Sequence, residues 1–286
     1  MSSWIRCGRA RDGVSADVRA ITLVALHVFR DSVRDKVLYS IVAFAVVLMS
    51  ASYLIGELTA GEDLKIIKDL GLAAMSLLGL FIAIFIGVGL IAKEMDRRSI
   101  YAVLVKPVRR HEFIIGKYLG LVGTLVVNLA VMAAAYYVVL VYMGWKLHPA
   151  TIQVAPAPPT DPRLLLAIVL IACELALVTA IALFLSTFVT SAFLSAGLTA
   201  ATYIAGQFGA DLKNFEQVVE SPMAGRFGRW LYYLLPNFAA FDVKTQVVHA
   251  LPIEQGYIPY TIGYGLIYIT LLLTGAVLIF SRRDFK

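Results

Sequence analysis

Long apolar runs separated by short polar connections dominate the hydropathy pattern of this chain. Six runs are long enough to cross the ~30 Å hydrocarbon layer of a bilayer as α-helices, and none alternates with the period of two expected of a spanning β-strand. They cover approximately residues 37–56, 70–92, 114–143, 163–187, 191–209 and 259–281. Lipid offers no partner to backbone N–H and C=O groups, so helices are the expected spanning structure. The pattern therefore predicts an all-α integral membrane protein with six transmembrane helices.

The residues before the first run predict a helix on the membrane surface. From Asp17 onward, one helical face carries His27, Arg30, Asp31, Arg34 and Asp35, and another carries Ile21, Val24, Ala25 and Val28. Such an amphipathic helix would lie along the inner surface and lead into the first span. Two interpretations remain open: a lipid anchor, or an elbow helix that also contacts a cytosolic partner. The chain thus divides into an N-terminal segment, 1–36, and a six-span domain, 37–286.

Composition and charge agree with this class and give it an orientation. The chain is 60% hydrophobic and 15% charged, unlike a soluble domain. Its net charge of +6 fits the positive-inside rule rather than nucleic-acid binding, because most of the 25 Lys and Arg fall at the two termini and between spans two and three. Both termini are therefore predicted to be cytoplasmic, with a short solvated outer link at 57–69. Cys7 and Cys173 fall at different depths, which argues against a disulfide framework. No cleavable signal precedes the first run.

The connection from Lys93 to Gly120 is short and strongly basic. Its cationic residues are Lys93, Arg97, Arg98, Lys106, Arg109, Arg110 and Lys117. Glu94 can pair with Arg97 or Arg98 at helical spacing, and Pro107 disfavours helix at Lys106, so the chain should turn there. Glu112 falls in the first turn of span three, where the helix dipole favours a carboxylate. These features predict a short helix across the cytosolic base, although an ordinary basic loop on anionic lipid has the same composition.

The order of residues in this connection resembles a known family. It supplies Glu94, Arg97, Leu104, Lys106, Pro107, Arg110, Glu112, Phe113, Gly116 and Lys117 in sequence. This pattern, with Leu234–Phe238 and Arg282–Phe285, is similar to that of the membrane permeases of type-2 ATP-binding-cassette (ABC) exporters. The chain departs from it at Ser99 and Ile100, where members often have Gly-Thr. The resemblance implies that segment 93–113 is a coupling helix seated in a groove of a separate nucleotide-binding subunit.

The resemblance also implies the partners of the chain. The residues expected to couple to the ATPase are Glu94, Arg97, Arg98, Lys106, Pro107, Arg109, Arg110, Glu112 and Lys117. This chain would form a dimer with a second copy of itself or with a homologous permease, and two copies of a cytosolic ABC ATPase would dock on that dimer. The dimer would lie in a bacterial inner membrane and contact its lipid. A periplasmic or accessory protein is a further partner that the resemblance allows. No phosphate-binding G-x-x-x-x-G-K-[ST] loop occurs, so ATP and Mg belong to the partner subunit and this chain is not itself an enzyme. The outer segment 210–258 is expected to hold interfacial or re-entrant helices before the last span.

Several polar residues inside the spans are candidates for a transport pathway. Glu174 lies near the middle of span four, where a charged carboxylate costs about 2.5–3.5 kcal/mol. It either bonds a neighbouring helix, such as through Asn128 of span three, or faces a substrate or cation path. Ser195, Thr199 and Thr202 form one hydroxyl stripe on span five. Such hydroxyls either bond their own helix backbone or line a pathway.

Span two contains a row of small residues at intervals of four, namely Gly79, Ala83 and Gly87. Small residues at this spacing let helix backbones approach closely in lipid. The row is interpreted either as packing within one subunit or as a dimer or pathway face.

The sequence thus predicts the permease subunit of an ABC transporter that exports or flips a hydrophobic or amphipathic substrate. The four histidines lie on different segments and no HExxH or CxxC motif occurs, so no metal site is expected. Two functions of other classes remain open. One is a motor-free channel or proton-coupled carrier that uses Glu174, and the other is a membrane scaffold that recruits a cytosolic partner through the basic connection.

Overall fold

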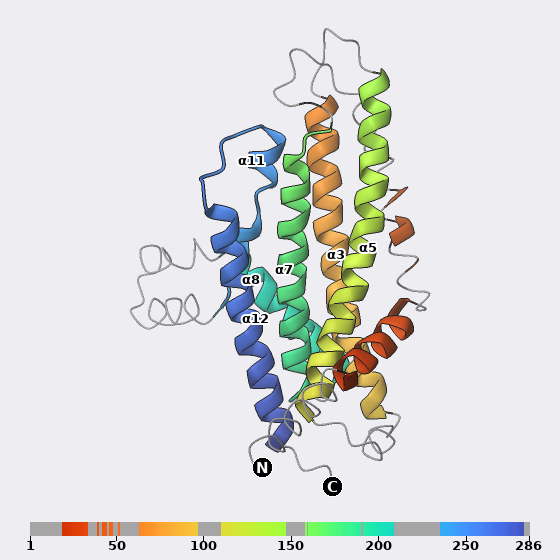
Figure 1. The fold of residues 1–286 in the computed structure, drawn as a ribbon, viewed down its shortest axis with the longest axis vertical. Helices are drawn as coiled ribbons and strands as arrows, with labels where there is room; N and C mark the ends of the chain where they lie inside the picture. Colours follow the sequence, from red (N-terminus) through yellow and green to blue (C-terminus); the bar gives the residue numbers. More distant parts are fainter. Residues whose placement is uncertain are drawn as a thin grey trace, which may run out of the picture.

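The computed structural model describes residues 19–33, 63–96, 110–146, 160–189, 191–208 and 235–282, with Pro158 and isolated positions between 39 and 51. Within these residues all regular structure is helical. The body of the molecule consists of α3 (Asp63–Asp96), α5 (Arg110–Lys146), α7 (Arg163–Ser186) and α12 (Tyr257–Arg282). Figure 1 shows these helices running along the long axis of the molecule, and α7 contacts the other three.

Each of the four long helices can cross a membrane by length and composition. The apolar stretches are Lys65–Val88, His111–Trp145, Arg163–Ser186 and Tyr257–Ser281, which correspond to predicted spans two, three, four and six. The all-α membrane architecture is therefore confirmed, and a total of six spans stays a prediction. Predicted span one falls largely outside the described residues. Predicted span five is α8 (Ala192–Gln207), whose 16 residues extend about 24 Å, less than the ~30 Å hydrocarbon layer.

Helix α7 lies at the centre of the bundle. It contacts α3, α5, α8 and α12. Leu177, Val178 and Ala180 point in different directions around its axis, and each is 0% exposed. The enclosure begins near Glu174, because Leu165 and Val169 closer to the start of α7 are 53% and 46% exposed. An apolar helix suits this position, since the faces of its second half meet other parts of the protein. Any polar group on α7 must therefore find its partner within the protein.

The row of small residues on α3 faces α7 of the same chain. A side chain added at Gly79 would meet Leu175, and one added at Gly87 would meet Ala182 with its Cβ 2.6 Å away. Ala83 between them is 1% exposed. The three residues therefore pack within one subunit, which corrects the interpretation of this row as a dimer face. The physical reason is that the backbone of α3 lies close to α7 at both glycines of this row.

Residues 19–33 form a helix that crosses the lower part of α5 (red in Figure 1). At Gly116 of α5, an added Cβ would lie 2.8 Å from the carbonyl oxygen of Ile21, and at Gly120 it would lie 2.6 Å from that of Ala25. Val28 is 5% exposed at this contact, whereas Leu23 is 61% exposed. The apolar face of this helix therefore packs on two glycines of α5, one helical turn apart.

The outer end of α3 differs from its prediction. The helix begins at Asp63, within the link predicted to be solvated, and Lys68 is only 1% exposed. The Lys68 ammonium donates a hydrogen bond to the carbonyl oxygen of Pro158 at 2.7 Å and interacts electrostatically with Asp161. The hydroxyl of Tyr136 donates in turn to the Lys68 carbonyl oxygen at 3.1 Å. The oxygen atoms of Pro158 and Asp161 explain how the Lys68 ammonium can be buried, because they replace the water that it loses on burial.

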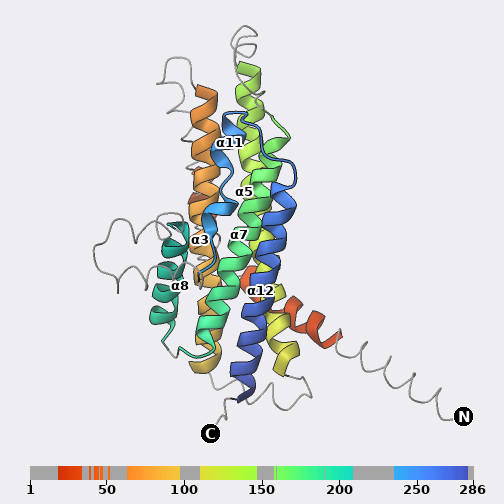
Figure 2. The same cartoon turned by 90° about the vertical axis from the view of Figure 1, so that its left-hand side faces the viewer.

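The end of the predicted outer segment packs along the side of the bundle. It contains the 3₁₀ helix η1 (Phe238–Phe241) and the short helix α11 (Lys244–Val248). η1 contacts α7 and α8, and α11 contacts α3 and α7. Phe238 and Phe241 are buried, and Figure 2 shows this segment beside the upper half of the bundle. It is therefore part of the packed structure rather than a detached surface loop, while residues 209–234 lie outside the described part.

Candidate functional site

Glu174 forms the centre of a polar cluster between α7 and α8. Its side chain is on the enclosed helix α7 and is 1% exposed. Its Oε1 accepts a hydrogen bond from the Tyr203 hydroxyl at 3.0 Å and another from the Gln207 amide nitrogen at 2.9 Å. The same amide nitrogen donates to the Tyr203 oxygen at 2.8 Å. The carboxyl group thus has partners on the neighbouring helix, as a buried polar group in a bilayer requires.

Two further groups extend the cluster. Ser76 of α3 interacts electrostatically with Tyr203, and α3 contacts α8 directly. Lys244 and Asp242 form an ion pair of 3.6 Å between Nζ and Oδ2, and both interact electrostatically with Glu174. The cluster therefore joins three helices and lies next to the segment that contains η1 and α11.

Local sequence explains how α8 comes to present Tyr203 and Gln207 to α7. Ser191 caps the start of α8, with its hydroxyl oxygen accepting from the Leu194 N–H at 3.4 Å. The link from α7 is only a few residues long, so α8 must return along α7. Tyr203 and Gln207 are four residues apart and therefore lie on the same face of α8. Both residues lie near the end of α8, where they reach Glu174 on α7.

Asn128 is not the partner of Glu174. Its amide nitrogen donates to the carbonyl oxygen of Thr124 on its own helix at 2.7 Å, and it is 9% exposed. Thr124 likewise donates to the Gly120 carbonyl oxygen at 2.9 Å. The specific expectation that Glu174 bonds through Asn128 is therefore corrected. An amide that reaches back along its own helix satisfies itself without a second helix.

The hydroxyl stripe of α8 divides between two environments. Ser195 and Thr199 are each 1% exposed and face the interior of the chain. Thr199 donates to the Ser195 carbonyl oxygen at 2.7 Å, and Thr202 donates to that of Leu198 at 2.8 Å. The two threonines thus bond their own backbone, one of the two interpretations of the sequence. The Ser195 hydroxyl is buried and has no hydrogen-bond partner among the described residues.

With this arrangement established, comparison with known proteins identifies the chain. The description "ABC-2 family transporter protein" matches residues 22–285. The chain belongs to this ABC-2 transporter family. It is an integral membrane protein and the permease subunit of an ABC transporter, as predicted. In this family the ATPase is a separate subunit. None of the curated proteins compared with the chain matches it significantly.

The connection that the ABC-2 resemblance assigns to the ATPase is only partly described. α3 ends at Asp96 and contains Glu94, and α5 begins at Arg110. Arg97, Arg98, Lys106, Pro107 and Arg109 lie outside the described residues. Their coupling role stays a prediction. The two helices that flank them end at the same end of the bundle, at the bottom of Figure 1.

Glu112 and Lys117 are placed where they cannot form an exposed docking surface. Each side chain is 2% exposed. The Lys117 ammonium lies 5.1 Å from the centroid of the Phe113 ring, and that ring stacks on Phe280 of α12 at 6.2 Å. Their assignment to direct ATPase contact is therefore corrected. They belong to the packed base of the permease, where α5 meets α12.

Sequence reasoning missed the groups that surround Glu174. Tyr203 and Gln207 follow it by 29 and 33 residues, and no local spacing links them to it. One signal was available, because Gln207 is an amide at the end of an otherwise apolar run, one turn after a tyrosine. Among the described residues, no group of three or more His, Cys, Asp or Glu could hold a metal ion. The contacts among Glu174, Tyr203 and Gln207 are hydrogen bonds.

Proposed function

We propose that this chain is half of a dimeric ABC transporter and moves a hydrophobic or amphipathic substrate out of the cell or between leaflets. Two copies of a cytosolic ATPase would dock on segment 93–113 of the two permeases. Membership of the ABC-2 family supports the ATPase partner and dimerisation. The strongest structural support is that α3 and α5, the two longest described helices, converge on the ends of this basic connection.

A push on this connection would be transmitted by rigid packing. α3 approaches α7 closely at Gly79 and Gly87, and the base of α5 is fixed to α12 through Phe113 and Phe280. Interiors packed in this way have low compressibility and pass displacement on rather than absorbing it. Helix α3 would therefore move with α7, and α5 with α12, when the ATPase closes.

Helix α8 is the element most suited to move relative to the others. Of its 16 residues only Ser195, Thr199 and Gly206 are buried. The polar cluster around Glu174 joins it to α7, and Gly206 packs closely against Pro236 and Phe238. Separation of α8 from α7 would expose Glu174, Ser195 and Thr199 to the space between the helices. In this proposal these residues line the pathway only after α8 has moved.

The outward face of α8 supports a second copy as its neighbour. Phe193 is 89% exposed, Leu194 55% and Ile204 56%. Helix α3, which contacts α8, exposes Phe81 at 47% and Phe85 at 59%. In the related exporters spans two and five meet across the dimer axis, and these faces belong to the corresponding helices. A dimer formed here would place the two α8 helices beside one pathway.

Charge reversal in the basic connection tests the docking role. Purify tagged wild type, the double variant Arg97→Glu/Arg98→Glu and a control, Arg163→Glu, from native membranes, and measure ATP hydrolysis by the bound material. Arg163 is exposed at the start of α7, at the opposite end of the bundle. The double variant should lose the associated hydrolysis, because like charges replace the proposed attraction. Wild-type and control material should retain it. Equal hydrolysis in all three would contradict docking at these arginines.

A further inference from the structure

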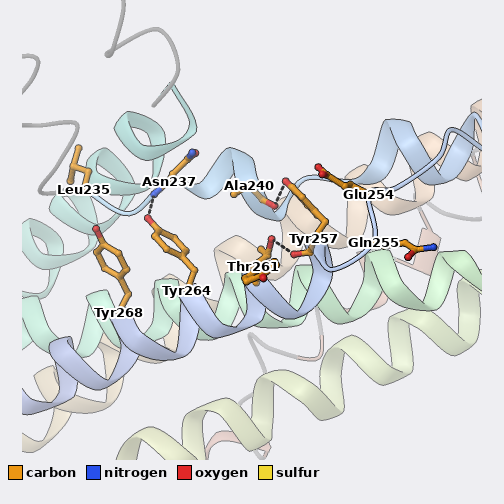
Figure 3. Close-up of a pocket in the computed structure, with 10 residues that line it drawn as sticks. Leu235, Asn237, Ala240, Glu254, Gln255, Tyr257, Thr261, Tyr264 and Tyr268 are labelled. Atoms are coloured by element: carbon orange, nitrogen blue, oxygen red, sulfur yellow. Dashed lines mark hydrogen bonds between the residues drawn. The ribbon is translucent and has the colours of Figure 1, made fainter.

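A cavity lies between the start of α12 and the segment that contains η1. Its volume is about 560 Å³, within the range of roughly 300–1,000 Å³ of small-molecule sites. Its wall on α12 carries Tyr257, Tyr260, Tyr264 and Tyr268, and its opposite wall includes Asn237. Figure 3 shows Tyr264 and Tyr268 rising from α12 toward Asn237 and Leu235. The cavity is separate from the Glu174 cluster and does not include its residues.

The two walls are joined by specific hydrogen bonds. The Asn237 backbone N–H donates to the Tyr264 hydroxyl oxygen at 2.8 Å, and the Tyr257 hydroxyl donates to the Ala240 carbonyl oxygen at 2.8 Å. The rings of Tyr264 and Tyr268 are 4.9 Å apart between centroids. Tyrosines at headgroup depth are common in membrane proteins and need no ligand. A belt of that kind does not require a second segment that hydrogen-bonds to the tyrosines through its main chain and forms an opposite wall.

The groups that line the cavity are electron-rich. Glu254 is the one ionisable carboxylate of the lining, and the described lining residues include no Lys, Arg or His. Aromatic faces attract cations through their ring quadrupoles, most strongly where water is excluded. The walls thus offer a carboxylate near one end and a row of tyrosine rings along α12.

We propose that this cavity binds the ammonium group of an amphipathic cation, with the apolar tail extending along the lipid-facing side of α12. The tail has a suitable surface, because Leu271 and Leu278 lie on the tyrosine side of α12 and are 64% and 56% exposed. This inference adds a ligand class and a second site to the proposed transporter. It does not depend on docking of an ATPase, since binding is measured without nucleotide.

Binding of a matched pair of probes tests the role of charge. The probes are octyltrimethylammonium and its neutral isostere, in which carbon replaces the nitrogen of the headgroup. Full-length protein is placed in phosphatidylglycerol nanodiscs, and saturable binding is measured in excess of empty nanodiscs. The cation should bind about 2- to 30-fold more tightly than the isostere, the range that cation–π energies give. Equal dissociation constants for the two probes would overturn the proposal, because the tail alone would then explain binding.

Variants of the lining locate the site. Tyr260→Leu and Tyr268→Leu should each raise the dissociation constant of the cation by about 2- to 30-fold and leave that of the isostere nearly unchanged. Tyr260 is 80% exposed, so its replacement should not disturb folding. Tyr142→Leu is the matched control, because Tyr142 is 47% exposed on α5 and does not line the cavity. Cation binding that both lining variants leave at the wild-type level would place the site elsewhere and reject the assignment.

The carboxylate is tested in the same assay. Glu254→Gln should weaken cation binding and reduce its dependence on salt, because one charge near the cation is removed. Asp69→Asn is the control, since Asp69 is an exposed carboxylate on α3 outside the cavity. An effect of Asp69→Asn as large as that of Glu254→Gln would indicate general attraction of cations to an acidic surface. That result would also reject the assignment.

A lipid headgroup and a free amphiphile could each supply the ammonium group. Repeating the titration in phosphatidylcholine nanodiscs distinguishes these sources. Loss of probe binding there, with retention in phosphatidylglycerol, assigns the cavity to a resident lipid headgroup. Retention in both lipids assigns it to a free cationic amphiphile. If charge reversal at Arg97 and Arg98 leaves ATP hydrolysis intact while the probes bind as expected, the docking proposal fails and this one stands.

Discussion

Replacing Gly120 with alanine should loosen the contact between residues 19–33 and α5. The added Cβ would lie 2.6 Å from the carbonyl oxygen of Ala25 and 2.8 Å from the Cβ of Val28. Ordinary van der Waals contact begins at 3.4 Å, so the two helices must separate locally by about 0.8 Å. The closest atom belongs to the backbone, and no change of rotamer can remove the clash.

The cost of this change follows from its geometry. A gap of 0.5–1 Å loses about a quarter to a half of each dispersion contact across it, and overpacking of a tight contact costs about 1–3 kcal/mol. For a chain of this size, that corresponds to a fall of roughly 2–5 °C in the unfolding midpoint. The intrinsic effect has the opposite sign, because alanine stabilises a helix over glycine by about 0.5–1 kcal/mol.

Thermal unfolding of purified protein, followed by intrinsic fluorescence at one scan rate, measures the difference. Gly263→Ala on α12 is the matched control, because an added Cβ there meets nothing within 4 Å. The control should match or slightly exceed the wild-type midpoint, whereas Gly120→Ala should fall below it. A Gly120→Ala midpoint equal to that of Gly263→Ala would refute the packing of residues 19–33 on this glycine.

Two further substitutions test buried polar groups. Glu174→Leu removes the acceptor of two hydrogen bonds and should destabilise the protein by about 1–3 kcal/mol in thermal unfolding. Glu174→Gln keeps an acceptor oxygen and should leave the midpoint nearly unchanged while altering substrate-stimulated ATP hydrolysis; wild-type hydrolysis would make Glu174 purely structural. Lys68→Met keeps the apolar stem but deletes the 2.7 Å bond to Pro158, and should cost about 1–3 kcal/mol. Arg163→Gln at an exposed site should cost far less, and equal losses would contradict burial of Lys68.

The membrane class of the protein could be predicted because it depends on local sequence. Each spanning helix must satisfy its backbone internally and present about 20 apolar residues to lipid. Predicted spans two, three, four and six follow this rule and are found as α3, α5, α7 and α12. The family could be recognised for a similar reason, because its motifs occur in a fixed order along the chain.

The pairing of helices could not be predicted in the same way. Lipid tails are as apolar as leucine, so hydropathy does not indicate which face of a spanning helix meets another. The row at Gly79 and Gly87 was compatible with two partners, and only the contacts with Leu175 and Ala182 decided between them. Glu112 and Lys117 read as surface charges beside a basic connection, yet both are buried at the base of the bundle.

The sequence by itself determined that this is a helical membrane protein with a basic connection of the ABC-2 type, since apolar length and motif order are properties of continuous stretches of chain. Tertiary structure decided that Glu174 bonds Tyr203 and Gln207 rather than Asn128, and that residues 19–33 rest on Gly116 and Gly120. It also created the tyrosine-lined cavity of α12. These features join residues far apart in sequence, and their geometry is fixed by close packing between helices rather than by any local pattern.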